Sequence, residues 1–124
     1  MAVPILKQGR VLIASIQAAL MDKDLIQLKD ELADKVGRLR AEAVIIDVSV
    51  LDVVDSFATR MLREIAGATA LRGARMMIVG IQPDVAFAMV QLGLTLEGIA
   101  TALDLDEGLD LLGLRLELDT DRDG

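Results

Sequence analysis

Apolar residues in this chain switch between helical spacing and short uninterrupted runs. Over residues 22–40 they recur every three or four positions, which predicts an amphipathic helix with Asp22 or Asp24 as its N-cap. The same spacing predicts helices over residues 56–71, from residue 82 to Gly93, and over residues 104–112. In the second of these helices one apolar stripe is expected to contain Phe57, Met61, Ile65 and Ala68.

The uninterrupted runs predict strands. Residues 4–7 and 11–17 flank Gly9 and suit a hairpin, because glycine takes a positive φ without steric cost. Residues 43–48 and 75–81 lack alternation, which is typical of strands covered on both faces, and residues 98–102 hold a shorter strand. The order ββαβαβαβα predicts an α/β fold with a mixed, mostly parallel sheet and helices packed against it.

The length of 124 residues fits one domain, which we place at residues 1–113. Residues 114–124 are expected to form an acidic and flexible C-terminal tail. The first residues do not resemble a signal peptide, and no apolar run approaches the roughly 18 residues that a membrane span needs. We therefore expect a soluble, cytoplasmic protein.

Composition excludes several kinds of chemistry. Hydrophobic residues make up 53% of the chain and aromatic residues 2%, and there is no His, Cys, Trp or Tyr. The usual ligands of zinc, copper, haem and iron–sulfur clusters are therefore missing, as are Ser–His–Asp and Cys–His catalytic sets. The net charge of −7 argues against binding to nucleic acid or to an anionic membrane. We expect a protein that is not an enzyme and holds no cofactor or metal.

The most unusual segment runs from Asp47 to Phe57. It carries three acidic residues and places Ser56 where the second helix should begin. The simplest interpretation of Ser56 is an N-cap whose hydroxyl accepts a hydrogen bond from the backbone of the first turn. Ser56 is also a candidate phosphoacceptor, and the two roles are compatible. Residues 80–84 are expected nearby, because the loops that follow parallel strands gather at one edge of the sheet.

Several motifs together resemble the STAS domain family and, within it, the RsbS-like antagonists of the stressosome. The resemblance covers residues 4–112 and is carried by Leu51-Asp-Val-Val-Asp-Ser-Phe57, Gly80-Ile-Gln-Pro83, Leu92-Gly93 and Thr101-Ala-Leu-Asp104. It implies a regulatory scaffold that sequesters an RsbT-like serine/threonine switch kinase and releases it when phosphorylated on Ser56. It also implies an RsbR-like STAS paralogue, an RsbX-like phosphatase, and assembly into a homo- or hetero-oligomer.

The resemblance further implies that the kinase faces the surface around the serine. The expected members of this kinase-facing surface are Asp52, Asp55, Ser56, Phe57, Thr59, Arg60, Arg63 and Glu64. The charged residues among them also have a simpler interpretation, as the ordinary solvated face of an amphipathic helix.

Other functions stay open at this point. A stand-alone STAS anti-sigma-factor antagonist, which binds a GHKL-type anti-sigma kinase outside any stressosome, would use the same serine chemistry. A receiver domain with Asp47 as acceptor would need a lysine late in the sheet, and no lysine follows Lys35. A glycosidase-like pair among Asp47, Asp52 and Asp55 would lack an aromatic platform for a sugar.

Overall fold

Five strands form one mixed sheet in a computed structural model that describes residues 3–18 and 20–113. The strands lie side by side in sequence order. Their bounds are β1 Ile5–Gln8, β2 Val11–Ser15, β3 Ala43–Asp47, β4 Arg75–Val79 and β5 Ala100–Ala102. β1 and β2 are antiparallel, and the remaining neighbours are parallel. The predicted fold class and element order are confirmed.

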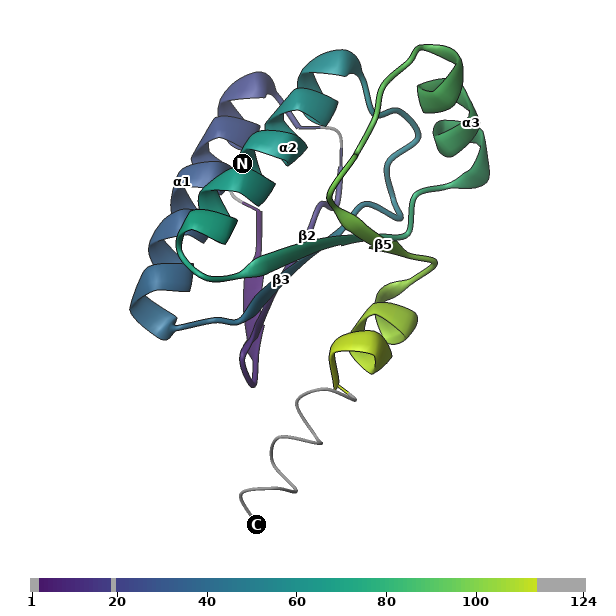
Figure 1. Cartoon of the computed structure of the whole chain (residues 1–124). Helices are drawn as coiled ribbons and strands as arrows, with labels where there is room; N and C mark the ends of the chain where they lie inside the picture. Colours follow the sequence, from purple (N-terminus) through teal and green to yellow (C-terminus); the bar gives the residue numbers. More distant parts are fainter. Residues whose placement is uncertain (1–2, 19, 114–124) are drawn as a thin grey trace.

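Helices cover both faces of this sheet. α1 (Asp22–Leu39), α2 (Ser56–Leu71) and α3 (Pro83–Gln91) lie on one face, and the helical residues 105–113 lie on the other (Figure 1). Among the described residues, no helix is both long and apolar enough to cross a membrane. The expected acidic tail, residues 114–124, lies outside the described residues.

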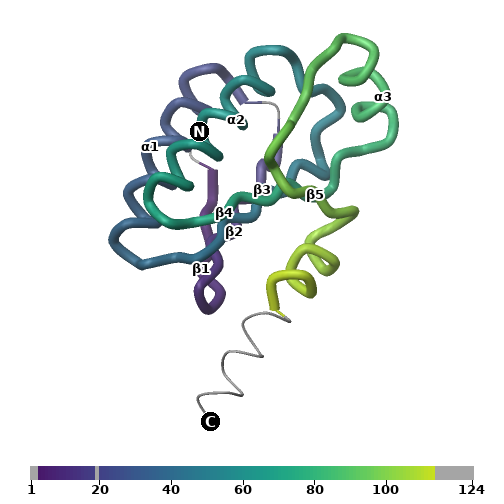
Figure 2. The backbone as a smooth tube through the Cα atoms, viewed as in Figure 1, coloured from purple at the N-terminus to yellow at the C-terminus, as the bar shows by residue number. Residues whose placement is uncertain are grey.

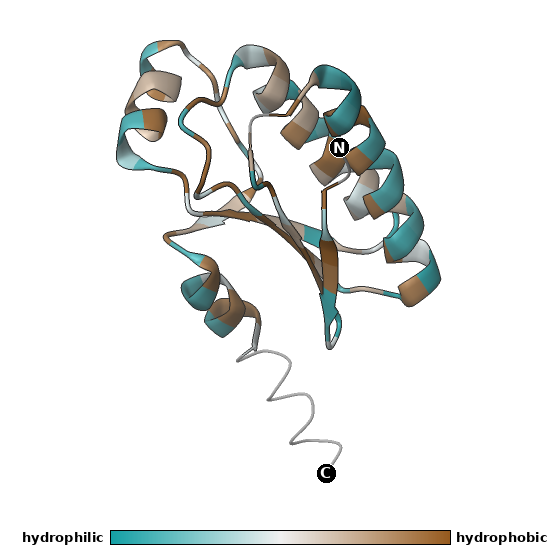
Figure 3. Ribbon diagram, turned by 180° about the vertical axis from the view of Figure 1, so that it is seen from behind, coloured by the Kyte–Doolittle hydropathy of each residue, from teal (hydrophilic) through white to brown (hydrophobic). Residues whose placement is uncertain are grey.

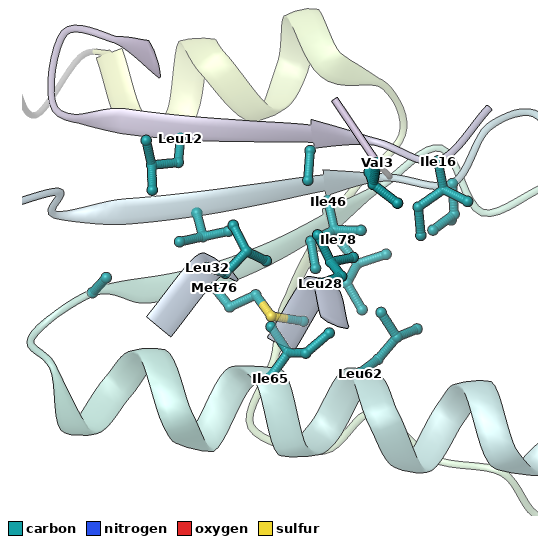
Figure 4. Packing of buried hydrophobic residues seen from close by; sticks show 14 of the residues in the cluster. Val3, Leu12, Ile16, Leu28, Leu32, Ile46, Leu62, Ile65, Met76 and Ile78 are labelled. Carbon is teal, nitrogen blue, oxygen red and sulfur yellow. The ribbon is translucent and has the colours of Figure 1, made fainter. Parts of the chain in front are cut away.

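The central strands are buried on both faces, as their unbroken apolar runs predict. In β3, Val44 and Ile46 join the core beneath α1 and α2, whereas Ala43 and Ile45 join the smaller core beneath residues 105–113. Figure 4 shows the larger core, where side chains of α1 and α2 meet those of the strands. Hydropathy colouring shows the same arrangement, with apolar strands between the two helical layers (Figure 3).

The start of α1 differs from the prediction. Met21 is the N-cap residue, so the assignment of Asp22 or Asp24 to this position is wrong. Asp24 lies in the first turn instead, and its carboxylate accepts a hydrogen bond from the Met21 N–H at 3.1 Å. A carboxylate three residues after the N-cap can therefore satisfy this backbone donor from inside the helix.

The parallel register brings two loops to one edge of the sheet. Asp47 at the end of β3 pairs with Val79 at the end of β4, and Val79 pairs with Ala102 at the end of β5. The segment of residues 48–55 that leads into α2 therefore leaves the sheet beside the segment of residues 80–82 that leads into α3. In Figures 1 and 2 the longer segment runs between the start of α2 and α3.

Candidate functional site

The segment of residues 48–55, here called the β3–α2 loop, begins with two tight turns. The Asp47 carboxylate accepts a hydrogen bond from the Ser49 N–H at 2.9 Å, and the Leu51 N–H donates to the Val48 carbonyl at 3.0 Å. Further along, Val54 is buried while the neighbouring Val53 is 72% exposed. The loop is thus anchored at both ends and presents its middle to solvent. Asp47 has a local role in shaping the turn.

The loop of residues 80–82 holds the β3–α2 loop in place. The Gln82 side-chain amide donates a hydrogen bond to the Ser49 carbonyl at 2.9 Å. Gly80 has a φ of 82°, and a Cβ at this position would lie 2.7 Å from the Ser49 Cβ. The expected proximity of the two loops is therefore confirmed. Sequence reasoning assigned Gln82 only to the start of a helix and missed its contact with Ser49.

Asp55, not Ser56, is the N-cap of α2. Its backbone is extended, and its carboxylate accepts a hydrogen bond from the Ala58 N–H at 2.8 Å. Ser56 is the first helical residue, so the prediction that its hydroxyl caps the helix is wrong. Ser56 is exposed, and within the described residues its hydroxyl has no hydrogen-bond partner. The hydroxyl is therefore free of the capping role that the sequence suggested.

Ser56 lies at the rim of a groove between the β3–α2 loop and α3. The groove has a volume of about 430 Å³. Its lining combines apolar side chains with three carboxylates, and its residues are Asp52, Val53, Val54, Asp55, Ser56, Asp84, Val85, Ala88, Leu92 and Leu94. Two of the predicted surface residues, Asp52 and Asp55, therefore meet Ser56 in one groove, and α3 adds a third acid, Asp84. The sequence did not single out Asp84.

The outward face of α2 carries the rest of the predicted surface. Arg60, Arg63 and Glu64 are exposed, and Phe57 is half-buried. The guanidinium carbon of Arg60 lies 5.2 Å from the centroid of the Phe57 ring, within the range of a cation–π contact. Arg63 donates a hydrogen bond to the Thr95 carbonyl at 3.4 Å.

Thr59 does not belong to this surface, which corrects its assignment from sequence. Its side chain is fully buried, and its hydroxyl donates to the Asp55 carbonyl at 2.9 Å. The reason is helical phase, because Thr59, Leu62 and Ile65 follow one another at three-residue steps along the buried face. A polar side chain can occupy this position since the preceding turn satisfies its hydroxyl.

The acidic residues near Ser56 do not form a metal site. In the described ranges, no group of three or more Asp or Glu side chains could hold a metal ion. What the site offers is an exposed alcohol beside an acidic, partly apolar groove, with Arg60 about one helical turn further along α2. Among the described residues, no carboxylate accepts a hydrogen bond from the Ser56 hydroxyl.

Comparisons with known proteins agree with this architecture. The family model of the STAS domain matches residues 2–108. The solved structure of Moorella thermoacetica RsbS, in a variant with serine replaced by glutamate, is 40% identical with a TM-score of 0.78, and the match covers 93% of this chain and 97% of that one. A chain from a structure describing the molecular architecture of the stressosome is 41% identical with a TM-score of 0.77, covering 91% and 98% respectively.

A sequence relative extends the comparison to a longer protein. The RsbT co-antagonist protein RsbRA of Bacillus subtilis (strain 168) is 29% identical over 83 residues, which is 67% of this chain. The matched region makes up 30% of the length of RsbRA.

Proposed function

Because this chain belongs to the STAS domain family, we propose that it is a non-enzymatic regulatory scaffold controlled by phosphorylation of Ser56. In the unmodified state it sequesters an RsbT-like serine/threonine switch kinase in a cytoplasmic, stressosome-type complex. Phosphorylation of Ser56 releases the kinase, and an RsbX-like phosphatase restores the unmodified state. An RsbR-like STAS paralogue forms the assembly together with this chain.

The observation that carries the proposal is the free Ser56 hydroxyl at the start of α2. Asp55 takes the capping role, so the Ser56 hydroxyl is exposed and has no partner in the described structure. In the proposed reaction Ser56 Oγ forms a bond to the γ-phosphorus of ATP, ADP leaves, and the hydroxyl proton passes to a base of the kinase. The scaffold contributes only the position of the acceptor.

The relatives support the choice of partners. Similarity at 40% identity to an RsbS protein, and at 41% to a stressosome chain, favours assembly with other STAS proteins. The name of RsbRA, an RsbT co-antagonist, favours an RsbT-like kinase as the sequestered enzyme. In this proposal the kinase contacts the groove beside Ser56 and the outward face of α2, where Phe57, Arg60, Arg63 and Glu64 lie.

Labelling by the cognate kinase tests the acceptor directly. The wild-type chain and the variants Ser56→Ala and Ser49→Ala are incubated with kinase and ATP, and intact mass spectrometry counts the added phosphoryl groups. Ser49 is a matched control because it is an exposed serine of the same loop. We expect one phosphoryl group on the wild type and on Ser49→Ala, and none on Ser56→Ala. Undiminished labelling of Ser56→Ala would refute the proposal.

The size of the complex tests the stressosome context. The chain is co-expressed with an RsbR-like paralogue and the kinase, and the purified complex is sized by light scattering. We expect a particle many times larger than a heterodimer, which contains the paralogue. A simple complex of this chain with a GHKL-type kinase would instead favour a stand-alone anti-sigma-factor antagonist.

A further inference from the structure

We propose that Arg60 binds the phosphate on Ser56 and leaves the ring of Phe57 to do so. The inference rests on the proposed function, since it concerns the phosphorylated form. It assigns to Arg60 the role of a positioning residue, which fixes where the phosphate lies and couples phosphorylation to a change on the outward face of α2.

Helix geometry places the two side chains together. Ser56 and Arg60 are four residues apart in α2, so their Cβ atoms lie on one face at about 5–6 Å. Long side chains on a helix point back toward its N-terminus, which directs Arg60 toward the first turn. The structure shows this direction, because the guanidinium carbon lies 5.2 Å from the ring of Phe57, the residue next to Ser56.

Arg60 is also available to a new partner. Arg60 is exposed, and within the described residues it contacts the ring of Phe57 and forms no ion pair. Arg10 pairs with Glu42 and Arg38 with Asp34, and both ion pairs lie away from this site. A guanidinium can bind phosphate through two parallel hydrogen bonds, which the ring of Phe57 cannot offer. Exchange of the ring for the phosphate is therefore favourable.

The charges around Ser56 decide on which side the phosphate lies. Asp52 and Asp55 of the loop and Asp84 of α3 line the groove with Ser56, so the groove side repels a dianion. Away from the groove, α2 offers the Arg60 guanidinium, whereas the Asp55 carboxylate already occupies the N-terminal end of the helix. The phosphate should accordingly turn from the groove toward α2.

This movement would explain how a modification at one atom reaches a wider surface. The phosphate adds negative charge at Ser56 and at the same time draws the cation away from Phe57. In the unmodified chain the kinase would bind a face of α2 on which Arg60 contacts Phe57. After phosphorylation this contact is broken, so the surface that the kinase binds has changed. Release of the kinase then follows from two changes rather than one.

The second pKa of the phosphate reports this contact. Phosphoserine is installed at position 56 during translation, so no kinase is needed, and ³¹P NMR follows the titration near pH 6. A guanidinium stabilises the dianion and lowers its pKa, so Arg60→Gln should raise the second pKa by about 0.3 unit or more. Arg60→Lys, which keeps the charge but loses the two parallel hydrogen bonds, should give an intermediate value.

Arg63→Gln is the matched control, because it removes the same charge from the same helix. Arg63 lies two turns from Ser56 and contacts Thr95 instead, and the Asp residues around the groove are unchanged in every variant. We expect its phosphate to titrate as in the wild type. An unchanged pKa in Arg60→Gln, or an equal rise in Arg63→Gln, would overturn the inference. Either result leaves the kinase labelling of Ser56 standing, and loss of that labelling would not alter this titration.

Discussion

Asp55 and Ser56 are neighbours at the start of α2, yet they have different physical roles. The Asp55 carboxylate satisfies a backbone N–H of the first turn, which the helix itself cannot satisfy. Ser56 already has helical geometry, so its hydroxyl is not needed there. Helix α2 therefore holds Ser56, the proposed phosphoacceptor, in place, and the stability of this helix does not depend on the Ser56 hydroxyl.

This division of roles predicts different effects on stability. Asp55→Ala should lower the free energy of unfolding by about 1 kcal/mol, because a capping side chain is lost. Asp52→Ala removes an equal charge from the same loop without removing a cap, and Ser56→Ala removes a hydroxyl without a partner. Both should stay within about 0.5 kcal/mol of the wild type. Urea unfolding measures all three, and an equal loss in Ser56→Ala and Asp55→Ala would show that Ser56 caps the helix.

At the scale of elements, the site depends on two loops from different strands. The β3–α2 loop has hydrogen bonds of its own, but the contact that places it against the sheet edge comes from Gly80 and Gln82. Because parallel strands end at the same edge, neither loop needs a long excursion to reach the other. Packing between these loops therefore fixes where α2 begins.

Alanine substitutions at two glycines distinguish the effect of backbone strain on stability from the effect of packing between the loops. Gly80 and Gly93 have φ values of 82° and 71°, so alanine is strained at either position. A Cβ at Gly80 would in addition press on the backbone of Ser49, whereas one at Gly93 meets no atom within 4 Å among the described residues. Gly80→Ala should thus lose about 1–3 kcal/mol more than Gly93→Ala.

Thermal and urea unfolding measure the difference in stability between Gly80→Ala and Gly93→Ala. The rate of labelling by the kinase shows whether the substitution at Gly80 also displaces Ser56. We expect slower phosphorylation of Ser56 in Gly80→Ala, since the displaced loop moves the start of α2, and an unchanged rate in Gly93→Ala. Equal losses of stability in the two variants would mean that the contact between Gly80 and Ser49 does not hold the loop.

For the whole molecule, phosphorylation should change binding much more than folding. The chain carries a net charge of −7, and the phosphate adds about −1.5 to −2. The helix dipole favours this charge by about 0.3–1 kcal/mol, and a guanidinium about 6 Å away favours it by roughly 1 kcal/mol more in water. Each of the three carboxylates that line the groove opposes it by about 1 kcal/mol at a similar distance, and less when salt screens the charges. The net effect on the free chain is therefore small, on the order of 1 kcal/mol at physiological ionic strength. In a packed interface the same dianion would have to lose its water, which costs several kcal/mol unless it is paired.

We therefore expect the phosphorylated chain to melt within about 5 °C of the unmodified chain. Its affinity for the kinase should fall by at least about tenfold, equivalent to about 1.4 kcal/mol. Differential scanning calorimetry and titration calorimetry on the same two preparations measure both quantities. A large fall in melting temperature with unchanged affinity for the kinase would mean that phosphorylation acts by destabilising the fold and not by weakening partner binding.

The order and type of the elements could be predicted from the sequence, because the spacing of apolar residues depends both on the local backbone geometry and on which face is buried. Unbroken apolar runs identified β3 and β4 as doubly covered strands, and the three-to-four spacing located the helices. The stripe expected in α2 was only partly right, because Met61 and Ile65 are buried, whereas Phe57 is half-exposed and Leu62 is buried instead. α2 packs against both α1 and β4, so its buried face is wider than a single stripe.

By itself, the sequence determined the order of the elements, the edge of the sheet at which Ser56 lies, and the lack of His, Cys, Trp and Tyr. Each of these depends on composition or on neighbours within one turn or strand. Only the tertiary structure decided that Asp55 caps α2, that Thr59 is buried, that Gln82 reaches Ser49 and that Arg60 lies over Phe57. The contact between Gln82 and Ser49 joins segments that are distant in the sequence. The other three outcomes depend on the residue at which α2 begins and on which of its faces is buried, and packing against α1 and β4 sets both.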